Sequence, residues 1–520
     1  MPVTVGLATP LASATDCGMR AAADGGNALD AALAAAAHLT VAYPHNCSIG
    51  GDLLALVRNP DGHIVFINAS GRAPKATDVD AVRAEHSRMP LRGPLSVTVP
   101  GLVSGWGSLH ALGAKLDWSQ LISPAAAAAR EGVSVSPGLA SAIADDATDI
   151  EANPALHRLL APGGRWLQSA AQLRQPALAA TLERIATHGA DAFYRGPLAE
   201  AVVAGAKQVG IPLTSDDLAG HTPDLAAPLS VGVNGWVVAS APPNSQGFAL
   251  LRLLALFDLI TAEGRAVSPI ETAQAFMAMT QQRDEILADP DAMNLDIAEL
   301  LTQEATQALA ASLPAINHHN SGSGHRPNGD TVAIAAADTD GWSVSLIQSV
   351  YYGFGSLLLD EGTGVLFHNR GACFSLDPQS PNVLAPGKRP LHTLTPVLAE
   401  REHERLAVGC MGGEMQPQIL FQVMVKLLHG LPAQDAVGAP RWTVGPWDRD
   451  DPPSRITHEA NVDPFVLRGL ADWRGPQHSI PYGTSEVGHA QAVRVSQYRD
   501  EPDVDVGTDP RADGAVHPAS

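Results

Sequence analysis

Apolar residues recur three and four positions apart through most of residues 102–309, which is the spacing that one buried face of an α-helix produces. Alanine, the strongest helix former, dominates residues 21–37, and Asp16 is placed to cap this segment. The sequence therefore predicts a helix over the first forty residues, in which Gly25-Gly26 marks a break or a close packing contact because adjacent glycines disfavour a helix. Further helices are predicted at 117–131, 177–188, 195–207, 247–260, 268–288 and 416–428.

Strands are predicted where apolar and polar residues alternate, or where a short β-branched run lies between turn residues. Residues 53–58 and 63–68 flank Asn-Pro-Asp-Gly at 59–62, a composition that favours a hairpin turn. Residues 331–338 and 341–349 form a second predicted hairpin. Single strands are predicted at 236–240 and 405–410.

Residues 311–330 (ASLPAINHHNSGSGHRPNGD) are polar, rich in glycine and serine, and poor in large apolar side chains. This composition is typical of a flexible linker, and it divides the chain into residues 1–330 and 331–520. Three histidines in the segment (His318, His319 and His325) could form a metal tract, but the composition favours a solvated loop.

Composition narrows the classes of protein that the chain can represent. Hydrophobic residues make up 45% and charged residues 17% of the 520 residues, which is typical of a globular protein. A net charge of −21 argues against a nucleic-acid partner, because such a partner is itself anionic. The sequence contains no apolar run of about 18 residues, so we expect no membrane span.

Cysteine usage and the first residues bear on the compartment. Cys17, Cys47, Cys373 and Cys410 are widely spaced and form no CxxC pair, so neither a disulfide framework nor a zinc site is indicated. The first residues show no basic segment followed by an apolar core, which is the pattern of a secretory signal. We therefore expect a cytoplasmic location.

Thr331 opens a predicted strand directly after the flexible segment, and this placement suits one kind of nucleophile. A threonine hydroxyl is weakly nucleophilic, but a threonine at a chain N-terminus has its own α-amine as a base. That amine has a pKa of about 7.7–8.0, so it can accept the hydroxyl proton near neutral pH. Cleavage between Asp330 and Thr331 would create such a residue. The alternative is that Thr331 begins the strand for packing reasons.

Segments along most of the chain resemble, in order, the motifs of the γ-glutamyltransferase (glutathione hydrolase) family of N-terminal-nucleophile hydrolases. These segments are GGNALDAALAAAAHLTVAYPHNCSIGGDLLALV (25–57), SVTVPGLVSGW (96–106), PPNSQG (242–247), GDTVAIAAADTDGWSVSLIQSVYYGFGS (329–356), GTGVLFHNRGACFS (362–375), PGKRPLHTLTP (386–396) and GCMGGEMQP (409–417). Each segment alone has low specificity, but the ordered set is specific.

The resemblance implies a four-layer αββα sandwich of the α/β (α+β) class. It also implies that the precursor cleaves itself between Asp330 and Thr331 into a large subunit, residues 1–330, and a small subunit, residues 331–520. The two would stay associated as a heterodimer, with or without further dimerisation. Thr331 would be the nucleophile, Ser349 takes the place of a second family threonine that hydrogen-bonds it, and Gly412 and Gly413 match the oxyanion-hole pair.

Several positions that bind the γ-glutamyl group in the family differ in this chain. Ser70 stands where the family has its carboxylate-binding arginine, and Arg72 follows two residues later. Cys373 replaces an aspartate that would pair with the α-ammonium group, and Arg370 replaces a glutamine nearby. A neutral thiol beside a guanidinium does not suit an ammonium group. The remaining departures are Tyr351 for an asparagine and His392-Thr393 for a Ser-Ser pair.

These departures predict an acyl group that carries a carboxylate and lacks an α-amine, because arginine binds carboxylates through two parallel hydrogen bonds. The residues predicted to bind substrate are Arg72, Arg370, His392, Thr393 and Tyr351. For Arg72 and Arg370 the alternative is structural ion pairing, and His392 could equally be a structural histidine.

The predicted reaction is hydrolysis of the amide of a small acidic, oxamate- or oxalyl-like acyl donor, as in the oxamate amidohydrolase-like branch that the departures resemble. One alternative is a γ-glutamyltransferase or glutathione hydrolase acting on γ-glutamyl amides. A second is a biosynthetic homologue that cleaves a C–N or C–C bond next to an acyl group, and a third is a non-enzymatic binding protein. The expected partner is a small-molecule substrate, and no cofactor or metal is expected because the base is the chain's own amine.

Overall fold

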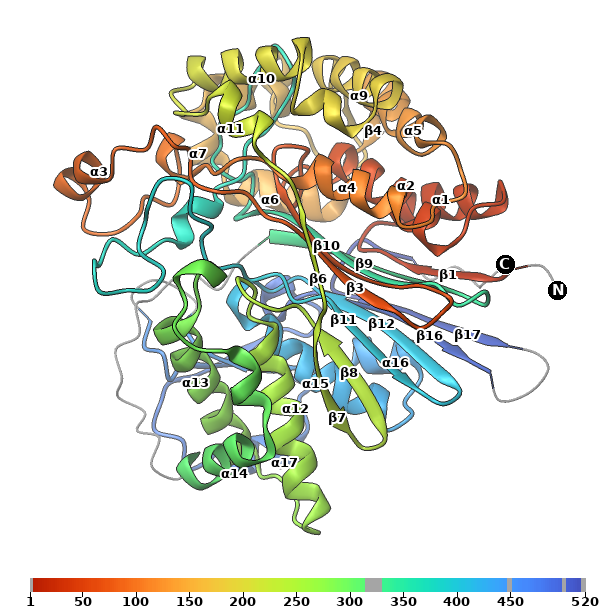
Figure 1. The fold of residues 1–520 in the computed structure, drawn as a ribbon, viewed down its shortest axis with the longest axis vertical. Coiled ribbons are helices and arrows are strands. Elements are labelled where there is room, and N and C mark those ends of the chain that lie inside the picture. The colour runs from red at the N-terminus through yellow and green to blue at the C-terminus, as the bar shows by residue number, and fades with distance from the viewer. Residues whose placement is uncertain (1–2, 314–329, 447–450, 498–501, 516–520) are drawn as a thin grey trace.

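The computed structural model describes residues 3–313, 330–446, 451–497 and 502–515. Its two six-stranded sheets pack against each other, and a layer of helices covers the outer face of each sheet (Figure 1). This confirms the predicted αββα sandwich.

The first sheet contains the predicted hairpin that begins near Thr331. Its strands follow the order β1 (Val5–Ala8), β9 (Asp330–Asp338), β10 (Ser343–Tyr351), β2 (Asp52–Arg58), β3 (Ile64–Ala69) and β6 (Asp224–Ala226). The β9–β10 hairpin therefore lies between strands from the first third of the chain. Every neighbouring pair in this sheet is antiparallel.

Strand β9 is buried on both faces, which explains its composition. Val332, Ile334 and Ala336 belong to the core beneath the upper helices, whereas Ala333 and Ala335 belong to the core between the two sheets. Alanine at the inner positions allows the sheets to approach closely, since its side chain is a single methyl group. The start of β9 is consequently held from both sides.

The second sheet has the order β17 (Asp503–Thr508), β16 (Ala490–Ser496), β12 (Glu404–Cys410), β11 (Val397–Arg401), β8 (Trp236–Ser240) and β7 (Leu229–Val233). Strand β12 crosses β9 in the opposite direction. Arg405, near the start of β12, donates a 2.9 Å hydrogen bond to the carbonyl of Asp338 at the end of β9. A Cβ on Gly409, near the end of β12, would lie 3.1 Å from Ala333 Cβ. The segment that follows β12 therefore begins above the start of β9.

The upper helical layer in Figure 1 covers the first sheet. Its longer members are α1 (Ala12–Ala23), α2 (Ala28–Ala42), α4 (Leu102–Ala111), α5 (Trp118–Glu131), α9 (Pro176–His188) and α10 (Pro197–Gln208). The break at Gly25-Gly26 is confirmed, because α1 ends before these glycines and α2 begins after them, but the cap predicted at Asp16 is wrong. Strand β1 precedes two helices, Asp16 lies inside α1, and Asn27 caps α2 after the glycine break.

Asn27 closes a capping box with Asp30, which satisfies backbone donors that Asp16 could not reach from inside the helix.

Shorter helices of this half are α3 (Val79–Glu85), α6 (Pro137–Asp145), α7 (Ala147–Glu151), α8 (Pro154–Leu160) and α11 (Ser215–Ala219). A two-stranded sheet joins β4 (Val133–Ser134) and β5 (Gln172–Leu173).

The lower helical layer covers the second sheet (Figure 1). It contains α12 (Gly247–Ala262), α13 (Pro269–Ile286), α14 (Gln303–Ser312), α15 (Gln416–Leu428), α16 (Ala433–Gly438) and α17 (Pro464–Gly469). A small sheet of β13 (Trp442–Val444), β14 (Ile456–Glu459) and β15 (Gln477–Ile480) accompanies it. The predicted helix at 416–428 has the bounds that the sequence indicated.

The predicted linker at 311–330 is shorter in the structure, because α14 continues to Ser312 and Asp330 already pairs in β9. Most of that segment, including the three histidines of the possible metal tract, lies outside the described residues.

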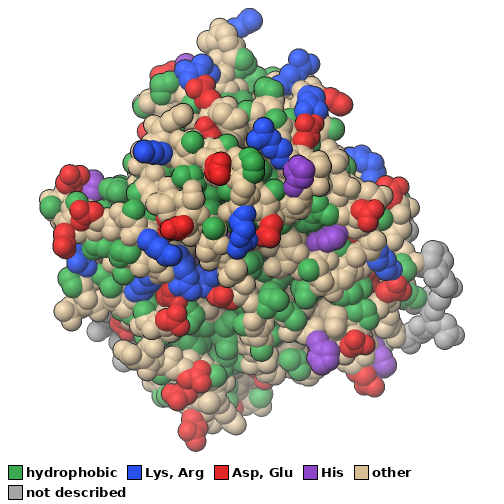
Figure 2. Space-filling model, turned by 45° about the horizontal axis from the view of Figure 1, so that its top comes forward, with side chains coloured by type: hydrophobic (Ala, Val, Ile, Leu, Met, Phe, Trp, Pro, Cys, Tyr) green, Lys and Arg blue, Asp and Glu red, His purple; other side chains and the backbone are tan. Residues whose placement is uncertain are grey.

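No helix in the described ranges is both long and apolar enough to cross a bilayer. All four cysteines are unpaired, as expected. Basic and acidic side chains are interspersed on the face shown in Figure 2.

Candidate active site

Thr331 and Ser349 face each other across the β9–β10 hairpin. They are paired in the antiparallel register, and both are buried. The Thr331 Oγ1 atom lies 2.9 Å from Ser349 Oγ, a hydrogen-bond distance in which either hydroxyl can donate. The structure thus brings together the predicted nucleophile and its predicted hydroxyl partner.

The Ser349 hydroxyl also contacts the peptide bond that precedes Thr331. Its Oγ donates a 2.8 Å hydrogen bond to the carbonyl oxygen of Asp330 and accepts one of 2.8 Å from the N–H of Tyr351. A bulge between Ser349 and Tyr351 makes this possible, and Tyr351 adopts the left-handed backbone conformation with φ of 80°. Such a conformation in a bulky residue is strained, and strain of this kind concentrates at functional sites.

Asn46 holds the other side of Thr331. Its Nδ2 donates a 3.2 Å hydrogen bond to the Thr331 carbonyl oxygen, while its buried Oδ1 has no recorded partner among the described residues. Asn46 lies within one of the segments that resemble the family, but no local pattern predicts a role for it.

Gly412 and Gly413 connect β12 to α15 above the start of β9. Gly412 has φ of 146° and Gly413 has φ of 52°, both in the region that glycine tolerates. A Cβ on Gly412 would clash with Ile419 Cδ1. The pair precedes the N-terminus of α15, where the helix dipole and the unpaired N–H groups favour negative charge. This geometry suits the predicted oxyanion hole.

Arg370 and its neighbours form a buried group of hydrogen-bond donors. Its guanidinium lies 4.2 Å from the centre of the Tyr351 ring, and Nη1 is 3.1 Å from Thr393 Oγ1 and 3.7 Å from Cys373 Sγ. Nε and Nη2 of Arg370 and the Tyr351 hydroxyl are buried without a hydrogen-bond partner in the described residues. Unsatisfied buried donors of this kind are costly unless a ligand completes them.

Asp52 orients Arg370 from behind. The Asp52 carboxylate is buried, lies 3.5 Å from Arg370 Nε, and contacts His368 Nδ1 and His392 Nε2 at 3.2 Å each. Although burial opposes ionisation, the charge and hydrogen bond of His368 and the hydrogen bond of His392 hold the pKa of Asp52 well below its usual range. Neither Asp52 nor His368 was singled out from the sequence.

His392 therefore lies in this support network. Burial, together with the positive charge of Arg370, lowers the pKa of His392 to about 3, so the imidazole is neutral at physiological pH. Its backbone carbonyl accepts a hydrogen bond from Gln246, whose side-chain amide donates to the carbonyls of Thr393 and Gly413. Gln246 thereby joins the segment that carries Thr393 to the glycine pair.

The structure places Arg72 in different surroundings from Arg370. Its Nη1 lies 2.9 Å from Asp289 Oδ2 and 3.1 Å from the carbonyl of Gly387, and 39% of its side chain is exposed. It lines a small cavity of about 140 Å³ together with His221 and Arg389. Of the two predicted arginines, Arg370 is the one that contacts Tyr351 and Thr393.

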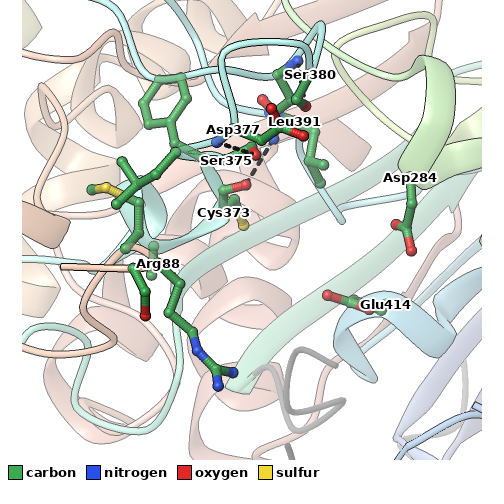
Figure 3. A pocket seen from close by; sticks show the side chains of 14 residues that line it. Arg88, Asp284, Cys373, Ser375, Asp377, Ser380, Leu391 and Glu414 are labelled. Carbon is green, nitrogen blue, oxygen red and sulfur yellow. Dashed lines mark hydrogen bonds between the residues drawn. The ribbon is translucent and has the colours of Figure 1, made fainter. Parts of the chain in front are cut away.

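A cavity of about 460 Å³ is lined by chain neighbours of these groups, although Thr331, Arg370 and Tyr351 themselves are not among its lining residues. Ala372 and Cys373, which follow Arg370, line one part of it, and Glu414, which follows Gly413, lines another. Figure 3 shows Asp284 and Glu414 side by side, with Cys373 on a different wall and Arg88 extending from a third. The volume is sufficient for a small-molecule substrate.

Within the described ranges, no group of three or more His, Cys, Asp or Glu residues is arranged to hold a metal ion. The chemistry that the arrangement offers is that of hydroxyl groups, backbone N–H donors and one buried guanidinium.

Two solved structures share the fold of this chain. The crystal structure of cephalosporin acylase from Bacillus halodurans superposes with a TM-score of 0.86 at 31% identity, covering 99% of this chain and 96% of that chain. The γ-glutamyltranspeptidase of Helicobacter pylori gives a TM-score of 0.54 at 26% identity over 58% of this chain and 89% of that chain. The fold is that of an N-terminal-nucleophile hydrolase.

Sequence comparison gives the family. The family model described as gamma-glutamyltranspeptidase matches residues 14–519, and the chain belongs to this family. It is 34% identical over 508 residues to the oxamate amidohydrolase proenzyme of Klebsiella pneumoniae, covering 95% of this chain and 94% of the relative. It is 32% identical to the glutathione hydrolase-like YwrD proenzyme of Bacillus subtilis, covering 97% and 96%. The protein is an enzyme of the hydrolase and acyltransferase class.

Proposed function

We propose that this chain is a self-processing threonine amidohydrolase whose precursor is cleaved between Asp330 and Thr331. The observation that carries the proposal is the Ser349 hydroxyl, which lies 2.9 Å from the Thr331 hydroxyl and 2.8 Å from the Asp330 carbonyl oxygen. One group thus contacts both the attacking atom and the carbonyl to be attacked. The proenzyme names of two relatives support the same reading.

After cleavage the free α-amine of Thr331 serves as the base for its own hydroxyl. The hydroxyl attacks the substrate carbonyl, and the N–H groups of Gly412 and Gly413 stabilise the negative charge that develops on the carbonyl oxygen. The amine then returns the proton to the leaving nitrogen, which gives an acyl-enzyme on Thr331. Water hydrolyses this ester and releases the acid.

The acyl donor in this proposal carries a carboxylate close to the reacting carbonyl. Arg370 supports it, because Nε and Nη2 are buried without a hydrogen-bond partner in the described residues, while Asp52 and the Tyr351 ring fix the guanidinium plane. A bidentate carboxylate would satisfy the Nη2 donor and share Nε with Asp52. Thr393 and the Tyr351 hydroxyl can complete its binding. An oxamate-like donor fits this arrangement, and a relative bears the name oxamate amidohydrolase.

One observation favours the γ-glutamyl alternative. Glu414 lies on the cavity directly after the glycine pair and shares Arg283 with Asp284, at 2.9 Å and 2.6 Å. The carboxylate oxygens of Glu414 and Asp284 on this wall of the cavity could receive the α-ammonium of a γ-glutamyl group. The name of the Bacillus subtilis relative agrees with this second candidate.

Two measurements test the proposal. Gel electrophoresis under denaturing conditions should show two fragments, and Edman degradation of the smaller should begin Thr-Val-Ala-Ile. The mature protein is then assayed with oxamate, with other N-acyl amides and with γ-glutamyl-p-nitroanilide. A wild-type preparation that is active while intact would refute self-processing. Preference for the γ-glutamyl substrate would favour the alternative.

Arg370→Lys and Arg72→Lys form a matched pair for the carboxylate. Loss of the bidentate contact predicts a fall of about 10²-fold in kcat/KM on oxamate for Arg370→Lys. Arg72→Lys should retain kcat/KM within about threefold, because its partners are Asp289 and the solvent-facing Gly387 segment. The reverse order would assign the carboxylate to Arg72.

A further inference from the structure

The side chain of Asp330, the residue before the scissile bond, lies in a cluster of charges that plays no part in the mechanism above. A Cβ placed on Gly353 would lie 2.6 Å from Asp330 Oδ2 and 2.9 Å from Asp146 Oδ2. The two carboxyl groups therefore converge on the same glycine, and the N–H of Gly353 donates a hydrogen bond to Asp330.

Arg92 is the positive group of this cluster. Its Nη2 lies 3.6 Å from Asp146 Oδ2, and its Nη1 donates to the carbonyls of Gly353 and Gly355. The guanidinium thus ties the loop after β10 to Asp146 and is shared between that loop and two carboxyl groups. Two ionised carboxylates that converge on one glycine repel each other, so the cluster favours retention of one proton.

The direction of the pKa shift of Asp330 agrees with the retention of one proton in this cluster. Burial, and after it the negative charge of Asp146, raise the pKa of Asp330 to about 7, although Arg92 and the Gly353 N–H oppose the shift. Asp145 adds a smaller negative contribution, and Tyr352 and Asp149 face Arg92. A carboxyl group with a pKa near neutrality can give up a proton and take one back at working pH.

Covalent geometry brings this proton to the bond that breaks. The Asp330 carboxyl carbon is separated from the Thr331 nitrogen by only Cβ, Cα and the carbonyl carbon, so rotation about the side chain brings a carboxyl oxygen to that nitrogen. Ser349 meanwhile donates to the Asp330 carbonyl oxygen from the other side. The scissile peptide group is therefore contacted by a hydroxyl and lies within reach of a carboxylic acid.

We propose that the protonated Asp330 side chain is the acid of the maturation step and donates its proton to the Thr331 nitrogen as the peptide bond breaks. This inference rests on the proposed self-cleavage. Thr331 Oγ1 forms a bond to the Asp330 carbonyl carbon, the bond from that carbon to the Thr331 nitrogen breaks, and the nitrogen gains the carboxyl proton. The hydroxyl proton of Thr331 restores the Asp330 acid, so the ester intermediate forms without net loss or gain of protons.

Water then hydrolyses the ester, which returns a proton to Thr331 Oγ1 and leaves an α-carboxylate on Asp330. From that point Asp330 belongs to the large subunit and takes no part in turnover. The proposal therefore separates two rates: a change at Asp330 slows maturation and leaves the activity of the matured enzyme unchanged.

The test follows maturation in cell-free translation by a radiolabelled pulse and chase between pH 5.5 and 8.5. The wild-type rate should fall as pH rises through about 7, because only the acid form donates. Asp330→Asn, which keeps the size of the side chain but has no acidic proton, should mature about 10²-fold more slowly and lose this pH dependence. Fragments that do mature should show wild-type kcat/KM.

Asp146→Asn gives an independent readout that does not depend on the folding of the Asp330 variant. Removing the negative neighbour lowers the pKa of Asp330, so the fall in rate should begin at lower pH. Asp145→Asn is the matched control, because Asp145 is exposed and contributes little, and its profile should follow the wild type.

Wild-type rate and pH profile in Asp330→Asn, or an unshifted profile in Asp146→Asn, would overturn the inference while leaving the proposed function intact. A wild-type chain that is never cleaved would instead refute the self-processing on which both rest.

Discussion

The Ser349 hydroxyl stands 2.9 Å from the hydroxyl of Thr331 and 2.8 Å from the carbonyl oxygen of the residue before it. In the proposed function, these two contacts serve two reactions that occur at different times. During maturation the hydroxyl can polarise the carbonyl under attack, and during turnover it remains beside the nucleophile. Side chains at this position therefore affect both rates.

Thr331→Ala removes the attacking oxygen. The variant should remain a single chain and lose essentially all amidase activity, a fall of about 10³-fold or more. Thr331→Ser is the matched control, since it keeps an Oγ and should still be cleaved. Band patterns on denaturing gels and initial rates on the preferred substrate distinguish the two. Two fragments from the alanine variant would contradict the assignment of Thr331.

Ser349→Ala removes the hydroxyl that contacts both partners. Maturation and kcat should each fall by about 10²-fold, because the nucleophile loses its hydrogen-bond partner and the Tyr351 N–H loses its acceptor. Ser349→Thr should restore both, as the family has threonine here. Pulse-chase maturation and steady-state kinetics measure the two effects, and an unaffected Ser349→Ala would argue that the contact is only structural.

Gly412→Ala tests the oxyanion hole through sterics. The new methyl group would meet Ile419 and require a strained backbone at φ of 146°, which displaces the N–H groups of the pair. We expect kcat to fall by about 10²- to 10³-fold. Gly232→Ala on β7 is the control, because a Cβ there meets nothing within 4 Å. Equal kcat in both variants would place the oxyanion donors elsewhere.

Buried histidines predict loss of stability in mild acid. Burial lowers the pKa of His45 and His392 to about 3 and that of His38, His221 and His489 to about 4. In the unfolded chain each has a pKa of about 6.5, so between pH 6.5 and 4 the unfolded state binds more protons. The free energy of unfolding should therefore decrease as the pH is lowered from 6.5 to 4, by up to about 1.4 kcal/mol per pH unit for each group.

Asp330 has the opposite effect on the free energy of unfolding, by one proton. Its pKa is raised in the folded state, so its stabilising contribution is lost as the pH rises toward 7. Urea unfolding of the single-chain Thr331→Ala variant at pH 5, 6 and 7 measures the net slope. His489→Gln should reduce the slope by one proton, because burial lowers the pKa of this histidine in the folded state. A midpoint that does not depend on pH would contradict the prediction.

Local patterns predicted the β9–β10 hairpin and the helix α15 after the glycine pair, through alternation, turn residues and helix signals within short windows. The roles of Ser349, Gly412 and Gly413 were predicted from the family resemblance. The N-terminal helix boundary was wrong because the backbone donors after the glycine break are satisfied by Asn27. Propensity alone did not identify that cap.

Local sequence patterns could not predict the residues that hold the site residues in place. Asp52 lies in a strand whose neighbours are apolar, and its partner His392 is 340 residues away, so only the fold shows that they meet. Arg72 and Arg370 have the same side chain, yet one is paired with Asp289 at a partly exposed site and the other is buried behind Tyr351. Sequence cannot separate them, because burial and pairing are set by tertiary contacts.

The β9–β10 hairpin lies between β1 and β2, and β7 and β8 complete a sheet whose other members follow residue 331. A cut at Thr331 therefore leaves two chains woven through common sheets, each holding strands whose hydrogen-bond partners belong to the other. The intact precursor can find this arrangement by unimolecular folding, whereas the cut enzyme, once denatured, has to find its partner by diffusion. Recovery of activity after denaturation should thus depend on protein concentration for the mature enzyme and not for the uncut chain. In practice, folding therefore has to precede cleavage.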